Sequence, residues 1–169
     1  WVSMQLGEIT ERDYWLERAR QTGTLVGKVW DKMSDFLIAA RGDEPDKVIR
    51  PEFLMTLSRV KLKGYTVAIL SNELDLFYGP TFRTRLGFLP EIDLIHDATY
   101  TKTLKPSPEA YENLINQLGV KAKDCVFVDD QSRNIVGAEA IGMRTVLFDV
   151  MKPGESYKKT ECLLGLGER

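Results

Sequence analysis

Residues 125–134, CVFVDDQSRN, give the strongest indication of how this chain folds. The short apolar run 126–128 is typical of a strand buried in a parallel sheet, and two aspartates follow it directly. A second run of this kind, residues 65–70 (YTVAIL), is followed by Ser71 and Asn72. Because ligands bind beyond the carboxyl ends of the strands in an open parallel sheet, we expect these polar side chains to meet at one edge.

A third polar group, Lys105, lies in the stretch LKPSP (104–108), directly before a predicted helix. Ser107 is expected as the N-cap of this helix and Pro108 in its first turn, and Gly119 is expected to close it. A hydroxyl, an ammonium and two carboxylates at strand ends suit one phosphate and one divalent cation. Each of them also has an ordinary structural explanation: a turn, a solvated loop lysine, and aspartates that cap the next helix.

Strands and helices are expected to alternate through the middle of the chain, which predicts an α/β fold, a doubly wound parallel sheet covered on both faces. The expected strands are 66–70, 92–95, 125–128 and 145–148, and the expected helices run from Pro51 to Gly64, over 82–86, from Pro108 to Gly119 and over 133–141. From Met151 onward the pattern is ambiguous.

The first 45 residues predict a helical segment with its own apolar face. Thr10 resembles an N-cap, with an acid three residues later. Apolar residues at helical spacing follow at Val26, Val29, Trp30, Met33, Phe36, Leu37 and Ala40. Tyr14, Trp15 and Trp30 are expected in the core of this segment, with a substrate-facing position as the alternative for a few of them. The expected organisation is therefore a helical part at 1–45, an α/β core at 46–150 and a C-terminal tail at 151–169.

Composition excludes several classes of protein. The formal charge of −2 gives no reason to expect nucleic acid or an anionic membrane surface as a partner. No apolar run reaches the roughly 18 residues of a membrane span. Cys125 and Cys162 do not make a disulfide framework, so we expect a reduced, buried thiol at Cys125 and a cytoplasmic protein. The sequence has no glycine-rich dinucleotide motif and no P-loop.

The ordered set Ser71-Asn72, Lys105-Pro106 and Asp129-Asp130 with Asn134 resembles motifs two, three and four of the haloacid dehalogenase-like (HAD-like) hydrolases. The resemblance runs from about Arg50 to Asp149. It implies a Rossmann-type α/β core, and the first 45 residues look like part of the helical cap that one subfamily inserts after motif one.

The resemblance also implies an activity, the hydrolysis of a small phosphate ester with Mg²⁺. Ser71 and the backbone amide of Asn72 would donate hydrogen bonds to the phosphoryl group, and Lys105 would supply positive charge. Asp130 would bind the Mg²⁺. Asp129 would support Lys105 or the water shell of the metal, which Asn134 would steady. The metal-free 2-haloacid dehalogenases are an alternative branch, but the Asp-Asp-x-x-x-Asn pattern favours the Mg²⁺-dependent phosphatases.

Motif one of that family is Asp-x-Asp on the central strand, where the first aspartate is the nucleophile and the second is the general acid and base. This sequence contains no Asp-x-Asp. The resemblance therefore implies that a strand is absent between the strands that end at Leu70 and Val128. We expect a truncated family member, or one that takes this strand from another chain, with poor turnover by itself.

Two consequences of the missing motif remain open. A non-catalytic relic of the family, which binds without reacting, is the alternative to a truncated enzyme. An unpaired strand edge would also favour pairing with another chain, so a homo-oligomer is one expected state. Among the remaining residues, we expect a structural role for His96, and Phe77-Tyr78-Gly79 could shape a pocket or only pack a loop. Cys125 has no base nearby in sequence to make it a nucleophile.

Overall fold

The computed structural model describes residues 2–5, 8–42 and 44–167, and the chain divides into two compact units. Unit 1 comprises Trp1–Val48 and Glu73–Gly87, and unit 2 comprises Ile49–Asn72 and Phe88–Arg169. The first division lies near the expected boundary at residue 45, but the segment 73–87 joins unit 1 as well. The expected assignment of a cap, a core and a tail to these parts stays a prediction.

The strands of unit 2 form two parallel pairs. β1 (Ala68–Ser71) pairs with β2 (Leu94–Asp97), with Ser71 opposite Asp97. β3 (Val126–Asp129) pairs with β4 (Arg144–Leu147), with Asp129 opposite Leu147. Parallel strands that alternate with helices confirm the predicted α/β class. The strands extend as far as the polar residues Ser71, Asp97 and Asp129, which are the last residues of β1, β2 and β3. Polar residues can belong to a strand because the hydrogen bonds between strands join backbone groups and do not depend on the side chain.

Within the described part of the chain, the two pairs are not hydrogen-bonded to each other, so they do not make one continuous sheet. All four residues of β3 are only half-buried. An interior strand of a parallel sheet is normally covered on both faces and by a neighbour at each edge. The break therefore leaves unpaired edges, and it falls between the strands where the sequence analysis expects a strand to be absent.

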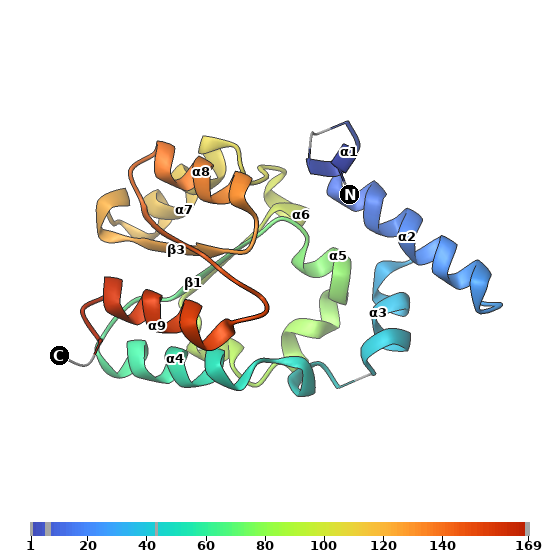
Figure 1. Ribbon diagram of the computed structural model, residues 1–169, viewed down its shortest axis with the longest axis horizontal. Coiled ribbons are helices and arrows are strands. Elements are labelled where there is room, and N and C mark those ends of the chain that lie inside the picture. Colours follow the sequence, from blue (N-terminus) through green and yellow to red (C-terminus); the bar gives the residue numbers. More distant parts are fainter. Residues whose placement is uncertain (1, 6–7, 43, 168–169) are drawn as a thin grey trace. The chain divides into compact units, whose positions relative to one another are not determined.

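Helices lie on both sides of these strands (Figure 1). α7 (Pro108–Leu118) and α8 (Ser132–Ala140) lie on one side, and α4 (Pro51–Leu62) and α9 (Pro153–Leu163) lie on the other. One buried cluster joins the first side to the strands; it contains Leu70, Ala110, Tyr111, Leu114, Ala138 and Met143. The short elements of unit 2 are α6 (Ala98–Thr101) and the 3-10 turns Leu89–Glu91 and Ala122–Asp124.

Most predicted helix ends in unit 2 are confirmed. Pro51 is the first residue of α4, Ser107 is the N-cap of α7, and Gly119 ends α7 in the left-handed conformation with φ of 67°. The helix α9 has no clear signal in the sequence, because it docks through scattered contacts rather than an apolar stripe. Glu161 of α9 is buried and accepts hydrogen bonds from Thr56 (2.9 Å) and Arg59 (2.9 Å) of α4.

Unit 1 is helical, as predicted. Its elements are α1 (Val2–Gln5), α2 (Glu11–Leu25), α3 (Met33–Arg41), α5 (Leu74–Tyr78) and the 3-10 turns η1 (Pro45–Val48) and η2 (Pro80–Arg85). Thr10 caps α2 by accepting a hydrogen bond from the backbone N–H of Asp13 at 3.0 Å. The short helix expected at 82–86 is present as the 3-10 helix Pro80–Arg85, which begins two residues earlier and ends one residue earlier than expected.

The apolar stripe expected from Val26 to Ala40 is wrong in its first half. The helix ends at Leu25, and Gly27 takes a φ of 67°, which reverses the chain and leaves Val26 and Val29 exposed. The core of unit 1 contains Ala19, Met33 and Leu37, with Trp15, Trp30, Phe36, Phe77 and Tyr78 packed against it. The described helices include none with the length and apolar character of a membrane span.

Candidate functional site

The carboxyl ends of β1 and β3 meet at Lys105. The Lys105 Nζ atom donates to the Oδ2 atom of Asp129 at 2.6 Å, and the two side chains are only 11% and 8% exposed. The side chain of Asn72 forms two hydrogen bonds with the backbone of Lys105. Its Nδ2 atom donates to the Lys105 carbonyl (3.1 Å), and its Oδ1 atom accepts from the Lys105 N–H (2.8 Å). Asn72 therefore fixes the main chain of Lys105, and Asp129 fixes its ammonium.

Both carboxylate oxygens of Asp129 accept hydrogen bonds from neighbouring residues. Besides Lys105 at Oδ2, its Oδ1 atom accepts from the backbone N–H of Gln131 at 2.8 Å and from Nδ2 of Asn134 at 3.0 Å. A carboxylate with three such donors is held in one orientation, and its charge is compensated. Asp129 is therefore a support for Lys105 and Asn134 rather than an open metal ligand.

In contrast to Asp129, Asn134 and Asp130 have side-chain oxygen atoms that accept no hydrogen bond from the described residues. Asn134 is 1% exposed, and its Oδ1 atom has no hydrogen-bond partner among the described residues. The amide must point this way because the carboxylate of Asp129 can only accept. A buried carbonyl oxygen without a donor costs about 1–3 kcal/mol. The neighbouring Asp130 is exposed, and none of the described residues forms a hydrogen bond or an ion pair with its side chain. Neither of these oxygen-bearing groups is therefore committed to a donor among the described residues.

Two residues that the sequence analysis does not single out support this arrangement. The hydroxyl of Tyr111, which is fully buried, donates to the backbone carbonyl of Asn134 at 2.8 Å. Burial raises the pKa of Tyr111, and the charge of Asp129 adds to this, so the hydroxyl stays a donor at neutral pH. A Cβ atom at Gly137 would lie 2.8 Å from the Pro106 carbonyl, so α8 can approach the loop of Lys105 only with a glycine at this position.

Ser71, the last residue of β1, directly precedes Asn72 and lies opposite Asp97 in the ladder. Asp97 is 2% exposed and accepts a hydrogen bond from the backbone N–H of Thr99 at 2.9 Å. Its sequence signal is weaker than that of Ser71, because His96 separates Asp97 from the apolar residue Ile95.

The other candidates have structural environments. His96 is buried, with Nε2 at 3.1 Å from the hydroxyl of Thr101, which fits the structural role expected for it. Cys125 is a free, half-buried thiol. Burial raises the pKa of Cys125, and the charge of Asp124 acts in the same direction, so little thiolate forms at neutral pH.

The strand ends thus bring Asn72, Lys105, Asp129 and Asn134 together, with Ser71 and Asp130 next to them in sequence. In the described part of the chain, no three His, Cys, Asp or Glu residues are grouped closely enough to hold a metal ion. Mg²⁺ needs fewer protein ligands, because it keeps several waters and binds one or two carboxylates together with phosphate oxygens. The carboxylate of Asp130 and the orphaned Oδ1 of Asn134 fit such a partly hydrated ion.

The comparisons with known proteins identify the family and the fold. Residues 8–142 match the family model described as haloacid dehalogenase-like hydrolase. The chain belongs to this family. As a HAD-like hydrolase, it shares its fold with a solved HAD phosphatase from Thermococcus onnurineus. That comparison has a TM-score of 0.66 and 22% identity, and it covers 99% of this chain and 79% of the other.

The HAD-like chain matches very different shares of two sequence relatives. It is 29% identical over 147 residues to sesquiterpene phosphatase astK of Aspergillus oryzae, which covers 85% of this chain and 69% of that protein. It is 24% identical over 169 residues to acyl-CoA dehydrogenase family member 10 of Mus musculus, of which it spans only 15%. Proteins named (S)-2-haloacid dehalogenase are also among its relatives, and the chain spans less than half of each of them.

Proposed function

We propose that this chain carries the phosphate-binding and Mg²⁺-binding groups of a phosphatase that acts on a small phosphate ester. The observation that supports this most strongly is the arrangement at the ends of β1 and β3. Asn72 fixes the backbone of Lys105, Asp129 fixes its largely buried ammonium, and the open carboxylate of Asp130 directly follows Asp129 in sequence. Phosphoryl transfer depends mainly on such positioning and charge neutralisation. Named phosphatases are among the relatives of the chain.

Each residue has a role in this proposal. Ser71 and the backbone N–H of Asn72 donate to the non-bridging oxygens of the phosphoryl group. Lys105 supplies the compensating positive charge, and Asp129 holds its ammonium in place. Asp130 and the Oδ1 atom of Asn134 hold the Mg²⁺, directly or through its waters. The bound Mg²⁺ would neutralise negative charge on the phosphate.

The nucleophile is the missing part of this phosphatase. The family's Asp-x-Asp does not occur in the sequence, and β1 and β3 belong to separate strand pairs. We propose that turnover requires one further strand, with its aspartates, that pairs with these two strands. The unpaired edges also favour association of two copies of this chain, which light scattering would detect. The lack of a disulfide framework supports the cytoplasm as the place where the protein works.

Two other functions remain as alternatives. A non-catalytic binding domain would use the same groups and would stay inactive even with the further strand in place. A 2-haloacid dehalogenase, which some relatives are named for, would release halide without a metal. The open carboxylate of Asp130 and the orphaned oxygen of Asn134 favour the Mg²⁺-dependent phosphatase over the dehalogenase.

The experiment is an assay of the purified chain with p-nitrophenyl phosphate and Mg²⁺, and in parallel with 2-chloropropionate without metal. We expect neither nitrophenol nor chloride above the level of a protein-free control, because the nucleophile is absent. Ordinary phosphatase turnover that Asp130→Ala abolishes would show that the chain holds its own nucleophile. Release of chloride would support the dehalogenase instead.

A further inference from the structure

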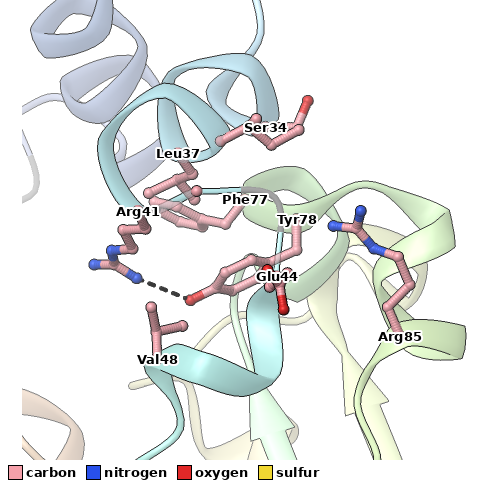
Figure 2. Close-up of a pocket in the computed structure, with 10 residues that line it drawn as sticks. Ser34, Leu37, Arg41, Glu44, Val48, Phe77, Tyr78 and Arg85 are labelled. Atoms are coloured by element: carbon pink, nitrogen blue, oxygen red, sulfur yellow. Dashed lines mark hydrogen bonds between the residues drawn. The ribbon is translucent and has the colours of Figure 1, made fainter.

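A second candidate binding site lies entirely within unit 1, in a small cavity between α3, η1 and α5 (Figure 2). Its volume is about 20 Å³. Apolar side chains make much of its wall: Leu37, Ile38, Val48, Phe77 and the ring of Tyr78. Ile38 and Val48 are 43% and 40% exposed, so they lie where the cavity meets the surface. A cavity of this size holds a water or a small polar head, and a larger ligand must extend outward along the apolar wall.

The charged side chains that line the cavity carry a net positive charge. Arg41 and Arg85 both line it, and the Nη1 atom of Arg41 donates to the hydroxyl of Tyr78 at 3.3 Å. Among the described residues, Arg41 has no acidic partner. The one carboxylate in the lining, Glu44, pairs with Lys47 at 2.7 Å. Among the described lining residues, two arginines therefore stand against one carboxylate, and that carboxylate already has a counter-charge.

The ends of the neighbouring helices reduce this positive charge but do not cancel it. Arg41 is the last residue of α3 and Tyr78 the last of α5, so both helices direct carbonyl ends toward this region. A helix C-terminus carries a partial charge of at most about −0.5, whereas each arginine carries a full positive charge at any relevant pH.

We propose that this cavity binds the carboxylate head of a small organic acid. The two carboxylate oxygens accept N–H donors from the guanidinium of Arg41, a geometry that suits a planar anion. The alkyl or aryl part lies against Leu37 and Phe77, where it removes apolar surface from water. The apolar wall favours an organic acid over inorganic phosphate. The site shares no residue with the phosphate site of unit 2, so it goes beyond the proposed phosphatase function.

The test is a titration of the full chain with sodium butyrate, followed by ¹H–¹⁵N NMR. Butyramide serves as the neutral probe of the same shape, and inorganic phosphate as the anion without an apolar part. We expect saturable shifts confined to residues 34–48 and 77–85 with butyrate, and none there with butyramide or phosphate. Arg41 is exposed, so Arg41→Gln should fold normally and weaken butyrate binding at least about tenfold.

Arg20→Gln is the matched control, because Arg20 is an exposed arginine of unit 1 that pairs with Asp31 and does not line the cavity. It should bind butyrate like the unmodified chain. Butyrate shifts that persist in Arg41→Gln, equal binding of butyramide, or no saturable shift in the unmodified chain would each overturn the proposal. None of these results bears on the phosphate site, which Asp130→Asn tests separately.

Discussion

The strand ends of unit 2 and the cavity of unit 1 each contain a cationic side chain. Lys105 in unit 2 is paired with an acid, whereas Arg41 in unit 1 is hydrogen-bonded to a tyrosine hydroxyl. The side chains of Lys105 and Asp129 are largely buried, and the two oxygens of Asp129 accept three N–H groups. Arg41 is exposed, and its partner among the described residues is a neutral group, the hydroxyl of Tyr78. A buried and fully paired charge is part of what holds the fold together, whereas an exposed and weakly paired charge is available to a ligand. Substitutions should therefore affect stability in the first region and binding in the second.

The largest effect is expected from Asp129→Ala. Removal of this carboxylate leaves the ammonium of Lys105 buried without a counter-charge and frees two further donors. Breaking a buried ion pair from one side costs about 3–5 kcal/mol of unfolding free energy. Urea unfolding followed by circular dichroism measures this loss.

Asp130→Ala is the control for this prediction, because Asp130 is the adjacent aspartate and its side chain is exposed. It should change the unfolding free energy by no more than about 0.5 kcal/mol. Equal losses in the two variants would show that Asp129 is not a structural support, and the contrast between the two regions would fail.

A smaller effect is expected from Gly137→Ala, which tests the support behind Lys105. The new Cβ atom would lie 2.8 Å from the carbonyl of Pro106 and 3.0 Å from the hydroxyl of Tyr111. Overpacking of this kind costs about 1–3 kcal/mol, which exceeds the gain of at most about 1 kcal/mol from the better helix former. Thermal unfolding should show a lower midpoint.

The matched substitution is Gly154→Ala, since a Cβ atom there would meet nothing within 4 Å in the first turn of α9. The midpoint should stay the same or rise. A Gly137→Ala variant as stable as Gly154→Ala would mean that α8 moves away from Pro106 without cost.

The smallest effect concerns Asp93, which lies on the surface of unit 2. Its carboxylate accepts from Lys61 at 2.6 Å and from the backbone N–H of Val67 at 2.7 Å. The hydrogen bond from Lys61, with that from Val67, lowers the pKa of the Asp93 carboxyl below its ordinary value. A group whose folded pKa is lowered stabilises the fold above its unfolded pKa, and this contribution is lost as the pH falls through the folded value.

Stability measured from pH 5 down to pH 2 should therefore fall less steeply in Asp93→Asn than in the unmodified chain. Identical slopes in both proteins would show that this exposed pair contributes nothing to the acid sensitivity of unit 2.

Local signals in the sequence predict much of unit 2. Pro51, Ser107 and Gly119 determine helix ends through backbone geometry and capping, which depend on neighbours in the chain. The strand ends follow from short apolar runs, so the positions of Asn72, Lys105 and Asp129 along the fold could be predicted.

The remainder depends on contacts between residues far apart in sequence. Apolar spacing alone extends the stripe of unit 1 through Gly27, where a positive φ turns the chain instead. The docking of α9 on Thr56 and Arg59 and the addition of segment 73–87 to unit 1 have no local signal. The saturation of Asp129 and the orphaned oxygen of Asn134 likewise need three-dimensional positions, because sequence gives residue types but not partners.

The central claim is that the strand ends of unit 2 hold a phosphate and a Mg²⁺ together. Isothermal titration of the chain with inorganic phosphate, with and without Mg²⁺, tests it most directly, in the unmodified chain and in Asp130→Asn. We predict that Mg²⁺ strengthens phosphate binding in the unmodified chain and has no such effect in Asp130→Asn, although both are folded. The same strengthening in both proteins, or no phosphate binding by the folded chain, would contradict the claim.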